Sequence, residues 1–251
     1  MKTFLIANWK LYVSGKASVK LARTYRSRFG GKKYPRVAQV LCPAMPELET
    51  LAVVLQSSGI ALGAQTVGHP ATAAATGDVS AVTLKEIGCR YVIVGHSERR
   101  AAGETDADIT LKLRAAAKAG LVPILCVGEP ASVRKTGRAA RFVTTQLTRA
   151  LNGFRGKTLL IAYEPVWAIS KAGKGAVACP PETADTMRLV VERVARKAAA
   201  KTRSHVLYGG SVDGKNIGSY LRPGGFAGAL IGFASTKPSE YARMVRVLSA
   251  Q

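Results

Sequence analysis

Acidic residues are scarce in this sequence, and long apolar runs are missing. Of the 251 residues, 37 are lysine or arginine and only 15 are aspartate or glutamate, which gives a formal net charge of +22. No apolar run reaches the roughly 20 residues that a membrane-spanning helix needs. Only Thr3 to Ala7 separate the first lysine from Asn8 and Trp9, which is too short for the core of a signal peptide. We therefore expect a cytoplasmic protein.

Cysteine pairs are also missing. Cys42, Cys89, Cys126 and Cys179 lie far apart, with no CxxC pair and no cluster of cysteine and histidine. Neither a zinc site nor a redox dithiol is indicated, and we expect reduced thiols. Cys126 lies between apolar neighbours, where a small core residue is the commoner role, so we predict no direct chemistry for it.

The excess of positive charge favours anionic partners without choosing among them. Phosphate compounds, nucleic acid and acidic lipid all fit a basic protein. The basic residues are spread along predicted helices, as on solvated helix faces, and form no compact arginine-rich arm. Nucleic-acid binding is possible but not favoured, because no basic motif with interleaved aromatic residues is present. Examples of the spread are Arg134, Lys135, Arg138, Arg141, Arg193, Arg196, Lys197 and Lys201.

Short apolar runs recur along the chain, and we predict a β-strand at each. They read TFLIAN, VAQVLC, IALGAQ, YVIVGH, LVPILCVG, TLLIAYE, HVLYGG and GALIG. The segments between them place apolar residues at the three- and four-residue spacing of a helix with one buried face. The predicted buried stripes are Val19, Ala22, Tyr25 and Phe29; Ile109, Leu113 and Ala116, after a cap at Asp106; Met187, Val190, Val194 and Ala198; and Tyr241, Val245 and Leu248.

The alternation of strands and helices predicts an α/β fold. Strands that are apolar almost throughout are typical of parallel sheets covered on both faces. Eight strand and helix units in 251 residues match a closed (β/α)8 barrel, and we expect residues 1–251 to form a single domain of this kind. An open doubly wound sheet is the alternative. In the barrel, reactive groups gather where strands end and βα loops begin.

Polar residues and glycines follow five of the predicted strands. They are Asn8-Trp9-Lys10, Gly95-His96-Ser97-Glu98, Glu164-Pro165, Gly209-Gly210-Ser211 and Gly232. Taken singly, such a lysine or glutamate is usually solvated, and such a histidine is usually structural. Together, a fixed cation, an imidazole, a carboxylate and glycine-rich turns can remove a proton beside a carbonyl in a phosphorylated substrate. The glycines would let backbone N–H groups approach the phosphate.

The motifs at these positions resemble the triosephosphate isomerase family. NWK, GHSERR, GET, AYEPVWAI, YGGSV and the final G-ASTKP follow the family's order over essentially the whole chain. The resemblance implies a (β/α)8 TIM barrel and an isomerase of glycolysis and gluconeogenesis. Such an enzyme interconverts dihydroxyacetone phosphate and D-glyceraldehyde 3-phosphate through an enediolate, and it needs neither cofactor nor metal.

The resemblance gives each reactive group a role. Glu164 would be the base, and His96 the neutral electrophile that polarises the carbonyl oxygen. Because Ser97 can cap a short helix there, we expect the helix amino terminus to keep the His96 ring uncharged. Lys10 would supply a fixed positive charge, and Asn8 a donor to the developing oxyanion. Glu98 would support Lys10, although a structural ion pair is an equal interpretation.

Phosphate binding and closure of the sixth βα loop are implied as well. The phosphate would meet backbone N–H groups of Ser170, Ser211, Gly232 and Phe233. Ile169 and Leu230 match an apolar pair that closes around the base, with ordinary rim packing as the equal alternative. The residues that would receive the closed loop through hydrogen bonds are Tyr208 and Ser211.

Two loops depart from the family's pattern. The sixth loop, from Ser170 to Pro180, is a few residues longer than usual, and Ser170 stands where the family has glycine. In the eighth loop, Phe233 replaces the second of two glycines. Both residues keep a backbone N–H donor, but neither has glycine's conformational freedom. We expect these changes to affect loop motion and phosphate affinity more than the reaction itself.

The third loop, TVGHPATAAATGDVS, bears on the oligomeric state. Its end around Thr76 resembles a segment that family members insert into a neighbouring subunit near Asn8 and Lys10, which implies a homodimer. A flexible surface loop is the alternative, and the high charge would oppose pairing of two like subunits.

Two other functions are compatible with the sequence. A different phosphosugar isomerase on the same barrel would explain the altered phosphate loops. A protein that binds nucleic acid or acidic surfaces would use the +22 charge instead of catalysis or alongside it.

Overall fold

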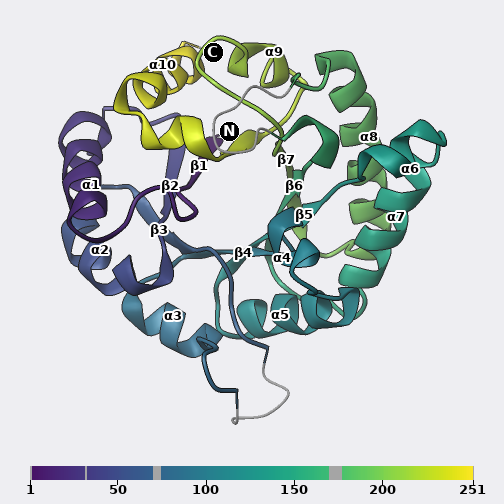
Figure 1. The fold of residues 1–251 in the computed structure, drawn as a ribbon, viewed down its shortest axis with the longest axis horizontal. Coiled ribbons are helices and arrows are strands. Elements are labelled where there is room, and N and C mark those ends of the chain that lie inside the picture. Colours follow the sequence, from purple (N-terminus) through teal and green to yellow (C-terminus); the bar gives the residue numbers. More distant parts are fainter. Residues whose placement is uncertain (1, 32, 70–74, 170–176, 251) are drawn as a thin grey trace.

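The computed structural model describes residues 2–31, 33–69, 75–169 and 177–250. Its strands close into a barrel in sequential order, and β1 pairs with both β2 and β8. All of these pairings are parallel (Figure 1). The predicted (β/α)8 barrel is confirmed, and the open sheet is wrong because no strand is left as an edge. The strands are β1 (Thr3–Asn8), β2 (Val37–Cys42), β3 (Ala61–Ala64), β4 (Tyr91–Val94), β5 (Val122–Val127), β6 (Thr158–Tyr163), β7 (Arg203–Tyr208) and β8 (Gly228–Ile231).

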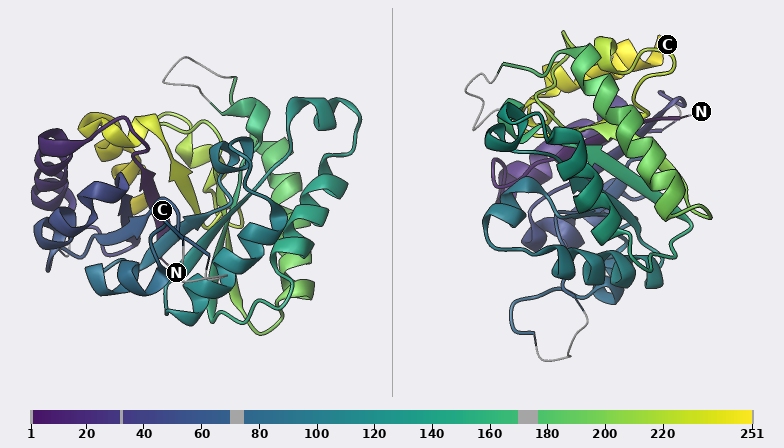
Figure 2. Two further views of the ribbon diagram at one scale, coloured as in Figure 1. Left: turned by 60° about the horizontal axis from the view of Figure 1, so that its bottom comes forward. Right: turned by 90° about the vertical axis from the view of Figure 1, so that its right-hand side faces the viewer.

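Helices surround the barrel on all sides in the views of Figures 1 and 2. Short 3-10 turns, η1 (Met45–Glu47), η2 (Val166–Ala168) and η3 (Phe233–Thr236), follow β2, β6 and β8. The α-helices are α1 (Gly15–Phe29), α2 (Leu48–Leu55), α3 (Ala81–Ile87), α4 (Ser97–Ala101), α5 (Asp106–Lys118), α6 (Ala131–Lys135), α7 (Ala139–Ala150), α8 (Pro181–Ala198), α9 (Ile217–Tyr220) and α10 (Pro238–Ser249).

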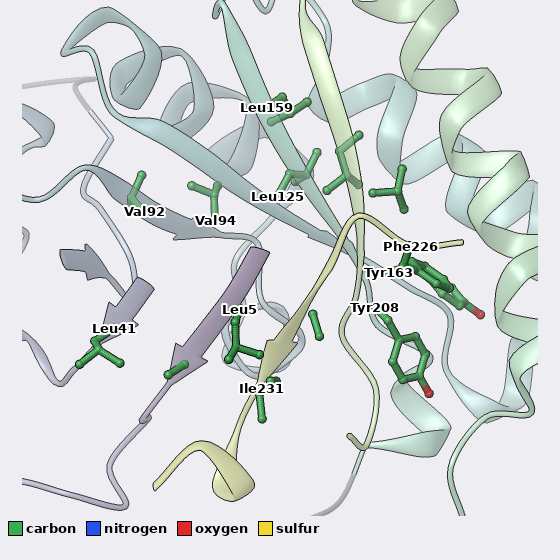
Figure 3. Close-up of a cluster of buried hydrophobic side chains, with 14 of the residues drawn as sticks. Leu5, Leu41, Val92, Val94, Leu125, Leu159, Tyr163, Tyr208, Phe226 and Ile231 are labelled. Atoms are coloured by element: carbon green, nitrogen blue, oxygen red, sulfur yellow. The ribbon is translucent and has the colours of Figure 1, made fainter. Parts of the chain in front are cut away.

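The core has two layers because successive strand residues face opposite sides of the sheet. In β1, Leu5 and Ala7 pack outward in the large cluster beneath the helices, whereas Ile6 belongs to the smaller cluster inside the barrel. Figure 3 shows part of the outer cluster, including Leu5 and Leu125. Both faces of the strands are therefore largely apolar, apart from residues such as Gln39 in β2 and His205 in β7, which is why the sequence shows continuous apolar runs instead of alternation.

Three of the four predicted helix stripes are correct in most positions. Ala22, Tyr25 and Phe29 are buried on α1, and the predicted residues of α5 and α10 are all buried. The cap of α5 was misplaced: Thr105 is the N-cap and forms a reciprocal capping box with Asp108, so Asp106 is the first helical residue. Capping boxes of this type need an acid three positions beyond the cap, and Asp108 meets that condition.

The stripe predicted for α8 is wrong beyond Met187. Val190 and Val194 are only half-buried, while Val191 and Ala195 face the core. The same face includes Arg188, whose guanidinium binds the carboxylates of Asp185 and Glu192 at 2.6 Å each. Apolar spacing alone cannot foresee a buried arginine, because its burial depends on these two partners.

The basic residues that the sequence placed on helices are mostly solvated, as expected, although Arg138 and Lys201 lie just outside the helices. All are exposed except Arg134, which packs over the ring of Trp167. Among the described residues, no helix combines the length and apolarity needed to cross a membrane. The described end of the third loop before α3, residues 75–80, projects from the ring of helices (Figure 1) and is exposed except at the half-buried Val79, whereas Val67 and Gly68 at the other end are buried.

Closure of the barrel depends on a glycine at the seam between β8 and β1. Gly228 pairs with Phe4, and a Cβ at Gly228 would lie 2.3 Å from the Phe4 carbonyl oxygen. We predict that Gly228→Ala lowers the free energy of unfolding by about 1–3 kcal/mol, because the added methyl group overpacks the seam. Urea unfolding measures the change. Gly218→Ala is the control, since its Cβ would meet only Val247 Cγ1 at 3.4 Å; equal midpoints for both variants would contradict the prediction.

Candidate active site

The carboxyl ends of the strands enclose a cavity of about 320 Å³. It brings together side chains at or just beyond the ends of β1, β4 and β6 with residues of the loops after β7 and β8. Tyr208 lies buried beneath it, Glu98 is exposed beside it, and Ser170 lies outside the described residues. The predicted site residues that line the cavity are Asn8, Lys10, His96, Glu164, Ile169, Ser211, Leu230, Gly232 and Phe233.

Glu164 follows β6 and is almost fully buried, with 2% of its surface exposed. The backbone N–H of Ser97 donates a hydrogen bond to Glu164 Oε2 at 3.0 Å. The other oxygen, Oε1, lies 3.3 Å from His96 Nε2. A buried carboxylate needs such partners, and here both come from the segment that follows β4.

His96 is held as one tautomer by the backbone. Its Nδ1 accepts a hydrogen bond from the N–H of Glu98 at 3.2 Å. A ring nitrogen that accepts carries no proton, so the remaining proton of the neutral ring sits on Nε2 and faces Glu164. The N-cap of α4 is therefore His96 itself, and the prediction that Ser97 caps this helix is wrong.

Lys10 has an unusual backbone conformation for a residue with a side chain, with φ of 48°. Its N–H donates to Asn8 Oδ1 at 3.2 Å, and its carbonyl accepts from Gln65 Nε2 at 2.9 Å. Gln65 also donates to the carbonyl of Cys42 at 3.0 Å, so it ties the first loop to β2. Since Asn8 uses its carbonyl oxygen for Lys10, its amide N–H groups are left to face the cavity.

The side chain of Lys10 is paired with Glu98. Lys10 Nζ lies 2.7 Å from Glu98 Oε1, with 13% of the lysine side chain and 62% of the glutamate side chain exposed. Glu98 thus touches both the predicted cation and, through its backbone, the predicted electrophile. Sequence reasoning did not identify Gln65, although this amide ends the apolar run IALGAQ at the same rim.

The two glycines after β7 make room for side chains of the site. A Cβ at Gly209 would lie 2.8 Å from Glu164 Cγ, and one at Gly210 would lie 2.3 Å from the hydroxyl oxygen of Tyr208. Within the described residues this buried hydroxyl has no hydrogen-bond partner. These glycines are therefore required by packing beneath the cavity, a reason that the sequence did not suggest.

The backbone N–H groups around the cavity differ in whether they already donate a hydrogen bond within the protein. The N–H of Ser211 donates to the carbonyl of Ala168 at 3.2 Å. Those of Gly232 and Phe233 donate to no acceptor in the part of the chain that the structure describes. The loop after β8 therefore presents adjacent donors, whereas Ser211 must first release Ala168 to bind a ligand through its N–H.

Glu129, which sequence reasoning missed, anchors the segment after Glu164. It is fully buried and accepts hydrogen bonds from Trp167 Nε1 at 2.8 Å and from the Tyr163 hydroxyl at 3.1 Å. Arg134 Nη1 lies 3.4 Å from the same carboxylate, and its guanidinium lies 4.4 Å from the centre of the Trp167 ring. Glu129 directly follows the apolar run LVPILCVG, so it stands at a strand end like the predicted site residues.

Cys126 lies inside the barrel and is fully buried. Burial raises the pKa of its thiol well above the ordinary value, and the nearby Glu164 carboxylate adds to the shift. The thiolate, which is the nucleophilic form, is therefore disfavoured. Among the described residues, no group of three or more His, Cys, Asp or Glu side chains is placed to hold a metal ion.

Comparison with known proteins gives one consistent result. The model of the triosephosphate isomerase family matches residues 3–248. The triosephosphate isomerase of Dehalococcoides mccartyi (strain CBDB1) is 38% identical over 249 residues, which cover 98% of this chain and 96% of the relative. That of Roseiflexus castenholzii (strain DSM 13941 / HLO8) is 40% identical over 259 residues, covering all of both chains. That of Aquifex aeolicus (strain VF5) is 36% identical over 252 residues, covering 98% and 99%.

The hydrogen bond from Ser97 to Glu164 can be removed without removing a side chain from the cavity. Ser97 is the first residue of α4, where proline is tolerated, and His96 has the extended conformation (φ −54°, ψ 144°) that a following proline requires. We predict that Ser97→Pro displaces the Glu164 carboxylate and lowers the free energy of unfolding by about 1.5–3 kcal/mol, as expected for a bond to a charged group.

A crystal structure and urea unfolding of Ser97→Pro test this prediction. Ser97→Ala is the matched control, because it loses the hydroxyl group and keeps the backbone N–H. Unchanged position and stability in the proline variant would show that this N–H does not hold the carboxylate.

Proposed function

Because the chain belongs to the triosephosphate isomerase family, we propose that it carries out the family's reaction with the groups that meet in this cavity. The chain is an isomerase that interconverts dihydroxyacetone phosphate and D-glyceraldehyde 3-phosphate, a step of glycolysis. The observation that carries the mechanism is the buried carboxylate of Glu164, which lies 3.3 Å from a ring nitrogen of His96 inside the cavity that Lys10 also lines.

Glu164 is the base of the proposed mechanism. Its carboxylate takes a proton from the carbon beside the carbonyl, which leaves an enediolate, and it then returns a proton to the neighbouring carbon. The hydroxyl proton of the substrate passes to the former carbonyl oxygen, so that the carbonyl and hydroxyl groups change places. His96 Nε2–H polarises the carbonyl oxygen during the first step. This N–H faces the Glu164 carboxylate in the structure. In the complex, the carbonyl oxygen of the substrate replaces the carboxylate beside His96 Nε2. The carboxylate is then free to act on the C–H group next to that carbonyl.

Asn8 and Lys10 stabilise the charge that develops on the enediolate. The amide of Asn8 is oriented as a donor, because its oxygen is occupied by the N–H of Lys10. The ammonium group of Lys10 is held in place by Glu98 and by the braced backbone of its own loop. Groups that are already in position cost no reorganisation when the charge appears, which is why such preorganisation accelerates a reaction.

The phosphate group is placed between the loops that follow β7 and β8. The N–H groups of Gly232 and Phe233 are its proposed donors, and they have no acceptor among the described residues. Ser211 joins them once its N–H leaves the carbonyl of Ala168. Ser170 remains a fourth proposed donor.

Closure of the sixth loop would exclude water from the reaction. Ile169 and Leu230 line the cavity, and their apolar side chains would shield the Glu164 carboxylate from water. The buried hydroxyl of Tyr208, which has no partner among the described residues, is the proposed acceptor of a bond from the closed loop. Anchoring of Trp167 by Glu129 would give the loop a fixed starting point.

We also propose a single-domain enzyme of the cytoplasm that acts as a homodimer through the loop around Thr76. Thr76 is exposed beside Gly77, whose φ of 89° is accessible mainly to glycine. An exposed loop that projects from the helices is suited to enter a second subunit near Asn8 and Lys10.

The role of Glu164 is tested by Glu164→Gln. We predict that kcat falls by about 10²–10⁴-fold, because the amide keeps the shape of the side chain and cannot accept the proton. The assay follows formation of dihydroxyacetone phosphate from D-glyceraldehyde 3-phosphate in metal-free buffer. Glu86→Gln, the same change on the exposed face of α3, is the control and should match the parent. A Glu164→Gln enzyme as active as the parent would refute the mechanism.

The dimer is tested by light scattering after size exclusion in moderate salt. We predict a mass of twice 26.5 kDa for the parent and a shift towards the monomer for Thr76→Arg. The added charge would be buried against a second chain of the same sign. Thr148→Arg adds the same charge to the exposed surface of α7 and should leave the dimer intact. A parent that is monomeric over a wide concentration range would exclude the proposed dimer.

A further inference from the structure

Two aromatic rings meet at the end of the cavity where the phosphate is proposed to bind. Tyr12 lies in the loop after β1, and Phe233 begins η3 after β8; both line the cavity. Their ring centroids are 5.2 Å apart and their planes are inclined by 79°, which is the T-shaped arrangement that aromatic pairs favour. The pair therefore joins the first loop directly to the eighth.

A second contact joins the same two loops at Lys10 and Gly232, which precede Tyr12 and Phe233 in the sequence. A Cβ on Gly232 would lie 3.6 Å from Lys10 Cε and 4.0 Å from Lys10 Nζ, so the end of the lysine chain packs close to the Gly232 backbone. The loops thus meet at successive points: Lys10 beside Gly232, and Tyr12 beside Phe233. Both contacts border the free N–H groups of Gly232 and Phe233.

The Phe233 ring also contacts Lys237, which lies four residues later in the chain. Lys237 Nζ lies 4.9 Å from the centre of the ring, within the range of a cation–π interaction. On the backbone, the hydroxyl group of Thr236 donates to the carbonyl of Phe233 at 2.8 Å. The Phe233 N–H shares a peptide plane with the Gly232 carbonyl, which accepts hydrogen bonds from the N–H of Ser235 at 2.9 Å and from its hydroxyl group at 2.7 Å. The ring of Phe233 and the plane of its N–H are therefore both fixed.

We propose that Tyr12 and Phe233 form an aromatic clasp that positions Lys10 and the Phe233 N–H for a phosphate dianion. The inference rests on the proposed function. Lys10 needs support because its backbone is strained, and the clasp lies two residues beyond it in the same loop. A glycine at position 233 could not make this contact, so the clasp gives the replacement by phenylalanine a structural purpose.

Because the clasp acts through other groups, Tyr12 and Phe233 are positioning residues. Their removal should weaken the binding of phosphate more than it slows proton transfer by Glu164. It should also make the two substitutions non-additive, since each alone breaks the same contact. A residue that only packed the loop would show neither effect.

The test is a double-mutant cycle of Tyr12→Leu and Phe233→Leu, read by titration calorimetry with inorganic phosphate and by steady-state kinetics. We expect each single variant to raise the Kd for phosphate and the KM for D-glyceraldehyde 3-phosphate by about 3- to 10-fold, the range that one aromatic pair supports. The double variant should be no worse than either single one, and kcat should change less than KM.

Two further variants make the result interpretable. Phe233→Tyr retains an aromatic ring and should restore phosphate affinity to within about twofold of the parent. Tyr34→Leu removes a ring from the pair between Phe29 and Tyr34, away from the cavity, and should leave the Kd for phosphate unchanged. Unfolding midpoints would establish that each variant is folded at the assay temperature.

The outcomes separate the clasp from the proposed function. A parent that neither isomerises the substrate nor binds phosphate would refute the function. An active parent with unchanged Kd and KM in both leucine variants would refute the clasp alone. The clasp would also fail if the double variant showed the product of the two single effects, because the residues would then act independently.

Discussion

Parallel pairing of β8 with β1 is the constraint on which the remaining structure depends. All of the strands pair in parallel and the ring is closed, so all of their carboxyl ends meet at one rim. The first and the eighth loops, which lie at opposite ends of the sequence, become neighbours through this pairing. Contacts such as Tyr12 with Phe233 and Lys10 with Gly232 exist only because the ring is closed.

The site is assembled by backbone groups as much as by side chains. The N–H of Ser97 holds Glu164, the N–H of Glu98 sets the tautomer of His96, and the N–H of Lys10 orients Asn8. Backbone donors are fixed once their strands and helices form, whereas a side-chain donor would have to lose rotamer entropy to do the same task. The rigid barrel thus supplies the precision of the site.

Much of this could be predicted from the sequence, because it follows from local patterns. Apolar runs located every strand, and the residues after them identified Asn8, Lys10, His96 and Glu164 as neighbours before any contact was known. Gln65 and Glu129 were not predicted as site residues, and the reason is the same for both. Their roles come from hydrogen bonds to partners that are distant in the chain. Gly209 similarly has no local reason to be glycine, because the atom it accommodates belongs to Glu164. The misplaced stripe of α8 reflects a pairing of Arg188 that apolar spacing does not encode.

The anchoring of Trp167 has a consequence for the conformational entropy of the chain that follows β6. Glu129 fixes the indole, and the segment Val166–Ala168 is wound into a 3-10 turn, so the chain leaves the barrel from one fixed stem. A chain that starts from a fixed direction has fewer conformations to search than one that is free at both ends. The Glu129 carboxylate beneath Trp167 therefore removes conformational freedom from this stem before any ligand is present, and it does so without lining the cavity.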